Sequence, residues 1–204
     1  SAPGLAPFET IRAVPVTRFR YAPRSWETLA YAGTMAEQVA GSWRGKLALL
    51  GLLGAGSRAV ARAVRDFAPD VVHAHWWFPG GVAAALGTSG PPLVVTLHGS
   101  DVRLAARSRF APAAFRYVAR RAAAMTAVSS WLARTAESFA PGLSVSVAPM
   151  PVDASLFAAG PWPRRPTLLS VGRLNAQKGT ADLLHLLTRL PPEADMRREL
   201  ERSA

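Results

Sequence analysis

The chain has 204 residues, 50% of them hydrophobic, with six tryptophans, so a folded protein of one large or two small domains is expected and extensive disorder is excluded. It has no cysteine, which excludes disulfide bonds and thiolate metal sites and suits a reducing compartment. The formal charge of +11 favours an anionic partner, but the arginines do not alternate with aromatic residues, so no nucleic-acid surface is expected.

The N-terminal third combines one interrupted strand with helices. Residues 11–21 predict a strand that is broken or lies at a sheet edge, because Pro15 cannot donate a backbone hydrogen bond. A weak helical pattern covers 26–43, and a strongly amphipathic one covers 45–67. The longest apolar run, 47–56, is shorter than the roughly 18 residues that suggest a membrane span, and the N-terminus does not resemble a signal peptide.

The long helical pattern contains a sequence that imitates a nucleotide-binding turn. "GAGSRA" at 54–59 has the glycine spacing of such a turn, which needs a strand before it and an acidic residue about 20 positions later. The preceding residues lack Val, Ile and Thr, and the corresponding strand end carries His75 and Trp76. We therefore interpret 54–59 as helix, with small residues that permit close packing.

Short runs with strand propensity then alternate with helical patterns. This alternation predicts an α/β fold of the Rossmann-like kind, a parallel sheet with helices on both faces. The strands are expected at 70–75, 92–98, 123–129 and 143–149, and the helices at 80–87, 102–122 and 130–139.

A linker and a second unit follow. Residues 149–166 contain five prolines and no periodicity, which is typical of a linker. A strand is expected at 167–171, and a helix is expected to start near Thr180 after a loop with glycines. His185 lies among leucines in that helix and is interpreted as structural.

Polar residues follow the predicted strands, and in an open parallel sheet ligands bind beyond the carboxyl ends of the strands. His73 and His75 share one face of their strand and could in principle ligate a metal, but no third ligand is evident, so we predict no metal site. The strand-end residues are His75, His98, Gly99, Asp101, Ser129, Ser130 and Arg173.

Five segments together resemble the family 4 glycosyltransferases, retaining enzymes of the GT-B fold. They are "PDVVHAHWWFPGG", "PLVVTLHGSD", "AVSSWLA", "PMPVDASLF" and "SVGRLNAQKG", in the family's order and approximate spacing. The resemblance implies transfer of a hexosyl group from a nucleotide sugar to an acceptor with retention of configuration. It also implies an acceptor-side Rossmann-like domain at 1–150, a linker at 151–166 and the beginning of a donor-side domain at 167–204.

The resemblance assigns roles to particular residues. His98 corresponds to the family's cleft histidine near the donor sugar or the attacking hydroxyl, and Gly172, Arg173 and Lys178 would hold the donor diphosphate. Cations there would stabilise the charge of the leaving group. Two plainer interpretations remain open: the cations are solvated loop charges, and His98 bonds to backbone while Asp101 caps the next helix. The remaining cleft candidates are His75, Gly99, Asp101, Ser129 and Ser130.

The chain also departs from the family. Nothing before residue 11 supplies the glycine-rich turn that touches the donor phosphates, and "PVD" at 151–153 replaces the more usual Gly-Val-Asp. Glu193 and Glu201 have the seven-residue separation of the family's donor-binding glutamates but lie in a charged tail without glycines. We therefore expect a partial enzyme that is inactive alone, with the nucleotide sugar as substrate and no cofactor or metal.

A different class of function remains open. The Arg-rich helix at 45–67 could make the chain a non-catalytic module for anionic lipid or phosphorylated ligands. The expected location is the cytoplasm, with peripheral attachment to the inner face of the membrane. The donor sugar, the acceptor and the oligomeric state have no signature in the sequence.

Overall fold

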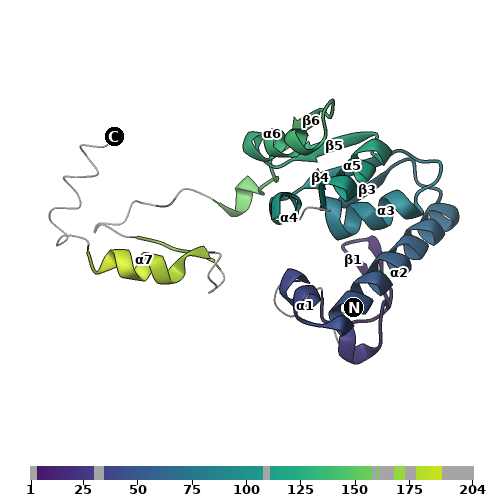
Figure 1. Cartoon of the computed structure of the whole chain (residues 1–204), viewed down its shortest axis with the longest axis horizontal. Coiled ribbons are helices and arrows are strands. Elements are labelled where there is room, and N and C mark those ends of the chain that lie inside the picture. Colours follow the sequence, from purple (N-terminus) through teal and green to yellow (C-terminus); the bar gives the residue numbers. More distant parts are fainter. Residues whose placement is uncertain are drawn as a thin grey trace. The chain divides into compact units, whose positions relative to one another are not determined.

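A computed structural model gives the structure of the chain and describes residues 4–29, 35–107, 111–157, 160, 168–172 and 178–189. The chain forms two compact units, Ser1–Pro151 and Val152–Ala204 (Figure 1). The division between them falls at the beginning of the predicted linker.

A four-stranded parallel sheet organises the first unit. Its strand order is β3-β4-β5-β6, the order of the chain, and each neighbouring pair is parallel. The four predicted strands and the α/β class are therefore confirmed. The strands are β3 (Val72–His75), β4 (Leu93–Leu97), β5 (Ala124–Ala127) and β6 (Val145–Val147).

Helices connect the strands, as a parallel sheet requires (Figure 1). The helical pattern predicted at 102–122 forms two helices, α4 and α5, because α4 ends at Arg107 and α5 begins at Ala111. The connecting elements are η2 (Trp77–Gly81), α3 (Val82–Gly87), α4 (Ser100–Arg107), α5 (Ala111–Arg121) and α6 (Ser130–Phe139).

The two faces of the sheet differ. Leu93, Val95 and Leu97 of β4 are at most 3% exposed and form one hydrophobic core with side chains from α3 to α6. The intervening Thr96 lies on the opposite face, where parallel register places it beside His75 of β3 and Thr126 of β5. This second face therefore carries polar side chains towards the carboxyl ends of three strands.

The N-terminal region folds as a hairpin followed by helices. The strand predicted at 11–21 is confirmed only in part: β2 (Val14–Thr17) lies within it, whereas Ile11 ends a separate strand, β1 (Phe8–Ile11), which pairs antiparallel with β2 across a turn. The turn residues Arg12 and Ala13 have φ of 48° and 65°, which reverses the chain. Pro15 does lie in a strand without a second neighbour, as its missing N–H requires. The helices are η1 (Arg24–Trp26) and α1 (Met35–Gly41).

The long amphipathic helix is confirmed as α2 (Trp43–Phe67). The hydroxyl oxygen of Ser42 caps it by accepting a 2.9 Å hydrogen bond from the Gly45 N–H. Residues 54–59 are helical, as we interpreted them, and a Cβ on Gly56 would lie 3.2 Å from Cβ of Ala83 in α3. This close approach explains the small residues.

By length and composition alone, α2 is the one described helix that could cross a membrane, with a window of mean hydropathy 1.4. The sequence contains no uninterrupted apolar run of that length, because Ser57, Arg58 and Arg62 interrupt it. Helices that pack inside soluble proteins meet the same criterion, so the finding assigns no membrane span. Leu49 and Leu52 of α2 indeed pack against an internal cluster.

The second unit contains η3 (Ala154–Leu156) and α7 (Thr180–Leu187), which begins where the sequence predicted. The strand predicted at 167–171 is wrong over its described part, 168–171, which forms no strand. Among the described residues of this unit no other strand is present to pair with it. Leu169 is accordingly 85% exposed.

Candidate functional site

The turn after β4 carries His98 and is held by a carboxylate. One oxygen of Asp101, Oδ1, accepts hydrogen bonds from the backbone N–H of His98 at 3.1 Å and of Gly99 at 2.8 Å. Gly99 has φ of 110°, a conformation that a residue with a side chain rarely adopts. The turn therefore presents His98 in one backbone orientation beside a position without a side chain.

The same carboxylate connects this turn to the one after β3. Its second oxygen, Oδ2, accepts a 3.1 Å hydrogen bond from the backbone N–H of Trp77. The indole Nε1–H of Trp77 in turn donates to the Asp101 carbonyl oxygen at 2.6 Å. Asp101 is 3% exposed and Trp77 is 1% exposed. Asp101 thus joins two strand-end turns from a buried position. This role exceeds that of a helix cap, which was the alternative interpretation of Asp101.

Trp77 is a site residue that sequence reasoning missed. Its run "WWFPGG" follows β3 directly, and this position after a strand could have marked it as a site candidate. The sequence does not indicate which of the two tryptophans is buried. The structure separates them: Trp77 lies in the core, whereas Trp76 is exposed and has φ of 60°. The Trp76 N–H donates to the Thr96 carbonyl oxygen at 2.9 Å, and its own carbonyl accepts from Gly81 at 2.8 Å. Both bonds fix the backbone around the exposed indole.

His75 ends β3, and the backbone that follows folds closely against it. A Cβ on Gly80 would lie 2.4 Å from the His75 carbonyl oxygen, so this position accepts only glycine without a backbone shift. The peptide bond between Phe78 and Pro79 is cis. The close approach of Gly80 to the His75 carbonyl shows that this turn lies against the end of β3.

Three histidines form a row across the two strand ends. The ring centroids are 4.5 Å apart for His73 and His75 and 5.1 Å apart for His75 and His98. The Nδ1 atom of His75 lies 2.9 Å from Nε2 of His98, a hydrogen-bond distance. The prediction that His73 and His75 share one face is confirmed. In the part of the chain that the structure describes, neither these three histidines nor any other three His, Asp or Glu side chains are arranged so that they could hold a metal ion.

His73 continues the row into the sheet through hydroxyl groups. Its Nε2 lies 2.7 Å from Oγ1 of Thr96, which lies 2.7 Å from Oγ1 of Thr126. Loss of water around its ring lowers the pKa of His73, and the charges that His75 and His98 would carry lower it further. His73 is therefore expected to remain neutral near neutral pH.

The two serines after β5 begin α6. The Ser129 hydroxyl oxygen caps this helix by accepting a 3.3 Å hydrogen bond from the Leu132 N–H, and Ser130 is exposed in its first turn. A Cβ on Gly99 would lie 3.6 Å from Cδ1 of Leu132, so the turn after β4 lies against α6. The structure thus places the ends of β3, β4 and β5 at one edge, as the parallel sheet predicted.

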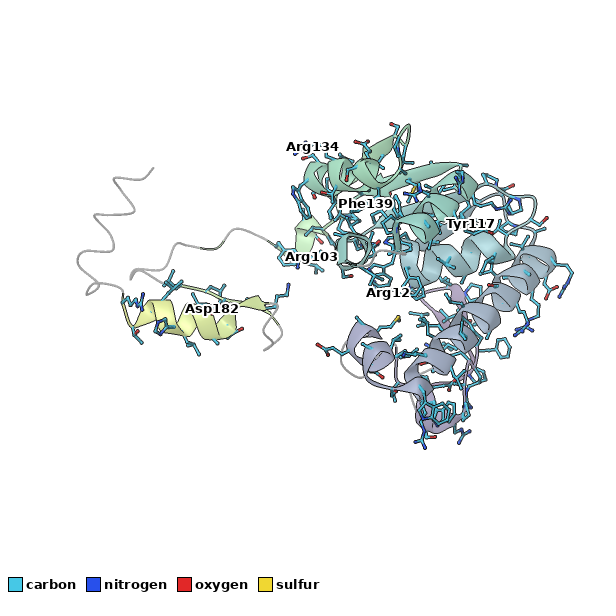
Figure 2. All side chains as sticks on the ribbon, in the orientation of Figure 1. Arg12, Arg103, Tyr117, Arg134, Phe139 and Asp182 are labelled. Carbon is cyan, nitrogen blue, oxygen red and sulfur yellow. The ribbon has the colours of Figure 1, made fainter. Side chains whose placement is uncertain are left out.

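The second unit places two of the predicted diphosphate residues together. A Cβ on Gly172 would lie 3.6 Å from Cγ of Lys178, and Lys178 is exposed. Gly179, with φ of 65°, leads directly into α7, in which Asp182 lies in the first turn (Figure 2). Arg173, Glu193 and Glu201 lie outside the described residues. The diphosphate assignment stays a prediction.

A parallel α/β sheet with polar side chains at the carboxyl ends of its strands defines a Rossmann-like domain with a candidate ligand edge. Residues 11–156 match the model of Glycosyltransferase Family 4, and the chain belongs to this family. The predicted resemblance is confirmed.

Curated relatives support the same family. The chain is 38% identical over 109 residues to the "Putative teichuronic acid biosynthesis glycosyltransferase TuaC" of Bacillus subtilis (strain 168). This match covers 49% of this chain and 28% of the relative. It is 34% identical over 151 residues to "Glycogen synthase" of Mycobacterium tuberculosis (strain CDC 1551 / Oshkosh), covering 62% of this chain and 33% of the relative. The chain therefore spans a third or less of the length of these relatives.

Proposed function

We propose that this chain contributes the acceptor-side domain, and the beginning of the donor-side domain, of a glycosyltransferase. The enzyme would transfer a hexosyl group from a nucleotide sugar to an acceptor hydroxyl with retention of configuration. The observation that carries the proposal is the His98 turn at the carboxyl end of β4, fixed by Asp101 in a chain that belongs to Glycosyltransferase Family 4.

His98 suits an acceptor hydroxyl because an imidazole can accept or donate a hydrogen bond through each ring nitrogen. Its neighbour Gly99 has φ of 110°, which glycine adopts readily and which sets the course of the backbone after His98. The names of the relatives refer to teichuronic acid biosynthesis and to glycogen synthesis. We therefore take a hydroxyl group of a growing saccharide chain as the acceptor.

The leaving group would be a nucleoside diphosphate, whose negative charge grows as the glycosidic bond breaks. Lys178 and Arg173 would supply compensating charge, and the N–H groups at the start of α7, which begins two residues after Lys178, would add the positive end of the helix dipole. In this proposal the nucleotide sugar is a substrate, and the reaction uses neither a metal nor another cofactor.

The test is an assay of the complete protein against a panel of nucleotide sugars with oligosaccharide acceptors, with the anomeric configuration of the product determined by NMR. His98→Ala is expected to lower kcat/KM by about 2- to 10-fold, the equivalent of about 0.5–1.5 kcal/mol for a hydrogen bond between neutral groups. His185→Ala, an exposed histidine of α7, is the matched control. An inverted product, or equal rates in both variants, would contradict the proposal. The 204-residue chain alone is expected to transfer little or no sugar.

A second candidate function is attachment to an anionic membrane surface through α2. Two leucines of the amphipathic pattern, Leu49 and Leu52, pack internally. The exposed apolar residues of α2 are Trp43, Leu47 and Leu50, with 61%, 49% and 66% exposure. Helical spacing places these three on one side of the helix, and Arg58 and Arg65 continue the same line. Residues 43–65 contain no acidic side chain, which favours an anionic surface.

Sedimentation with vesicles tests this candidate directly on the 204-residue chain. Binding to vesicles of phosphatidylcholine with phosphatidylglycerol is expected, with weaker binding to phosphatidylcholine alone. The change of Trp43, Leu47 and Leu50 to Ser should abolish binding, whereas Trp131→Ser, which replaces a tryptophan of α6 with 56% exposure, should not. Equal binding by all variants would exclude α2. Such attachment would place the protein in the cytoplasm at the inner face of the membrane.

A further inference from the structure

One hydrogen bond connects the two strand ends through their histidines. It joins Nδ1 of His75 to Nε2 of His98 over 2.9 Å. Both partners stand on fixed backbone: His75 is the last residue of β3, paired in register with Thr96, and His98 belongs to the turn that Asp101 holds. The contact is therefore built by the sheet and its turns rather than by long, freely rotating side chains.

The shared hydrogen couples the two imidazoles. A neutral imidazole has one nitrogen that donates and one that accepts. When Nε2 of His98 accepts from His75, Nδ1 of His98 carries the hydrogen and can donate it. When Nε2 of His98 donates to His75, Nδ1 of His98 is an acceptor. The tautomers of the two rings are therefore coupled: whether His75 donates or accepts in this bond determines what His98 offers at Nδ1.

The other ionisable groups nearby are engaged elsewhere. His73, next to His75 on β3, directs its Nε2 to Thr96. Asp101 of α4 accepts from the backbone N–H groups of His98, Gly99 and Trp77, and not from an imidazole. Within the described ranges, His75 is the one side chain in hydrogen-bond contact with the His98 ring.

We propose that His75 is a positioning residue that fixes the ring orientation and the tautomer of His98, so that Nδ1 of His98 meets the substrate in one defined state. The part concerning substrate rests on the proposed function. The part concerning the two imidazoles does not, because it can be measured on the free chain. The sequence alone predicts that His75 lines the cleft, whereas here its role is to fix the tautomer of His98.

The first measurement is a long-range ¹H–¹⁵N NMR correlation of the imidazoles in the ¹⁵N-labelled 204-residue chain. The chain has four histidines, so every ring can be assigned by single substitution. His98 should show a single tautomer in the unmodified chain. His75→Asn places an amide near the Nδ1 position and should preserve that tautomer, whereas His75→Gln places it near Nε2 and should give an exchanging mixture.

Controls separate positioning from general disturbance of the fold. His73→Gln changes the neighbouring ring without removing the His75 bond and should leave the His98 tautomer unchanged. The indole N–H signal of Trp77, which donates to Asp101, should be retained in every variant as evidence of intact turns. Identical His98 spectra in the Asn and Gln variants of His75, or a mixture of tautomers already present in the unmodified chain, would overturn the proposal.

The second measurement uses the complete protein and the transfer assay. His75→Gln should lower kcat by about 2- to 10-fold, the worth of one hydrogen bond, with little change in KM for the donor, and His75→Asn should restore the rate. If the tautomer of His98 changes in His75→Gln but the transfer rate does not, His75 positions His98 as proposed, and the tautomer of His98 has no role in catalysis. If His98→Ala loses activity but the tautomer of His98 is the same in all His75 variants, the proposed function of His98 is supported and the positioning role of His75 is overturned.

Discussion

Two apolar stretches of similar design have different fates in the two units. Leu93–Leu97 and 168–171 are each followed by a glycine, Gly99 or Gly172, and further along the chain by a helix, α4 or α7. The first becomes β4, hydrogen-bonded to a strand on each side, with Leu97 0% exposed. The second forms no strand, and Leu169 is 85% exposed. Strand propensity is thus a local preference that becomes structure only where neighbours pair the backbone and cover the side chains.

The starts of the two helices, α4 and α7, show the same contrast. Each has an acidic residue shortly after a glycine with positive φ, Asp101 after Gly99 and Asp182 after Gly179. Asp101 is buried and accepts from three backbone N–H groups of two turns. Asp182 is exposed in the first turn of α7. A second turn from a neighbouring strand is what gives the first carboxylate its structural importance.

The largest effect is expected from truncation of the two strand candidates. Leu97→Ala should lower the free energy of unfolding of the first unit by about 2–5 kcal/mol, because it removes a fully buried side chain and leaves a cavity. Leu169→Ala should change stability by no more than about 0.5 kcal/mol, as an exposed site allows. Urea unfolding followed by circular dichroism measures both. Similar losses would mean that 168–171 is packed in solution.

The next largest effect concerns the two carboxylates. Asp101→Ala should cost about 1.5–3 kcal/mol or more, because hydrogen bonds to a charged acceptor are lost and buried N–H groups are left unpaired. Asp182→Ala, labelled in Figure 2, should cost at most about 1 kcal/mol through the helix dipole. Chemical denaturation of both variants provides the comparison. Equal costs would remove the structural distinction between the turns.

The first unit was largely predictable because its signals are local and agree with each other. Four β-branched runs separated by helical periodicity identify a parallel sheet, and each predicted run contains a strand. The hairpin at Phe8–Thr17 was missed because its turn, Arg12 and Ala13, has no glycine or asparagine to mark it. The strand at 167–171 failed because pairing depends on residues far away in sequence, which propensity does not contain.

The site was predictable to the level of strand ends. His98 and His75 were found because the carboxyl ends of parallel strands share one edge of the sheet. Their direct hydrogen bond was not, because it depends on ring rotation and strand register. Asp101 was found as polar, but its link to Trp77 requires knowledge of how two turns pack. Sequence thus locates the edge, and tertiary structure determines which groups connect across it.

Lys178 allows the second unit to be tested for function, as the first unit is tested at His98. If it holds the leaving diphosphate, Lys178→Ala should reduce the transfer rate of the complete protein by about 10- to 150-fold, with little change in melting temperature. Arg173→Ala should act in the same way. Lys178→Arg should also be slow, because a planar guanidinium does not reproduce a compact ammonium contact. Unchanged steady-state rates in both alanine variants would show that Lys178 and Arg173 do not bind the diphosphate and are ordinary solvated charges.

The smallest effect is expected at His73, whose environment also depends on a neighbouring strand, through Thr96 of β4. Loss of water around the ring, together with the nearby His75 and His98, lowers its pKa in the folded chain. As pH falls through about 6.5, the unfolded chain therefore binds a proton that folded His73 resists, so stability declines until the lowered folded pKa is passed. His73→Gln keeps an amide group near Thr96 but cannot titrate, and should lose less stability than the unmodified chain between pH 8 and pH 5.5. Parallel losses in urea unfolding at the two pH values would show that His73 titrates as it does in water.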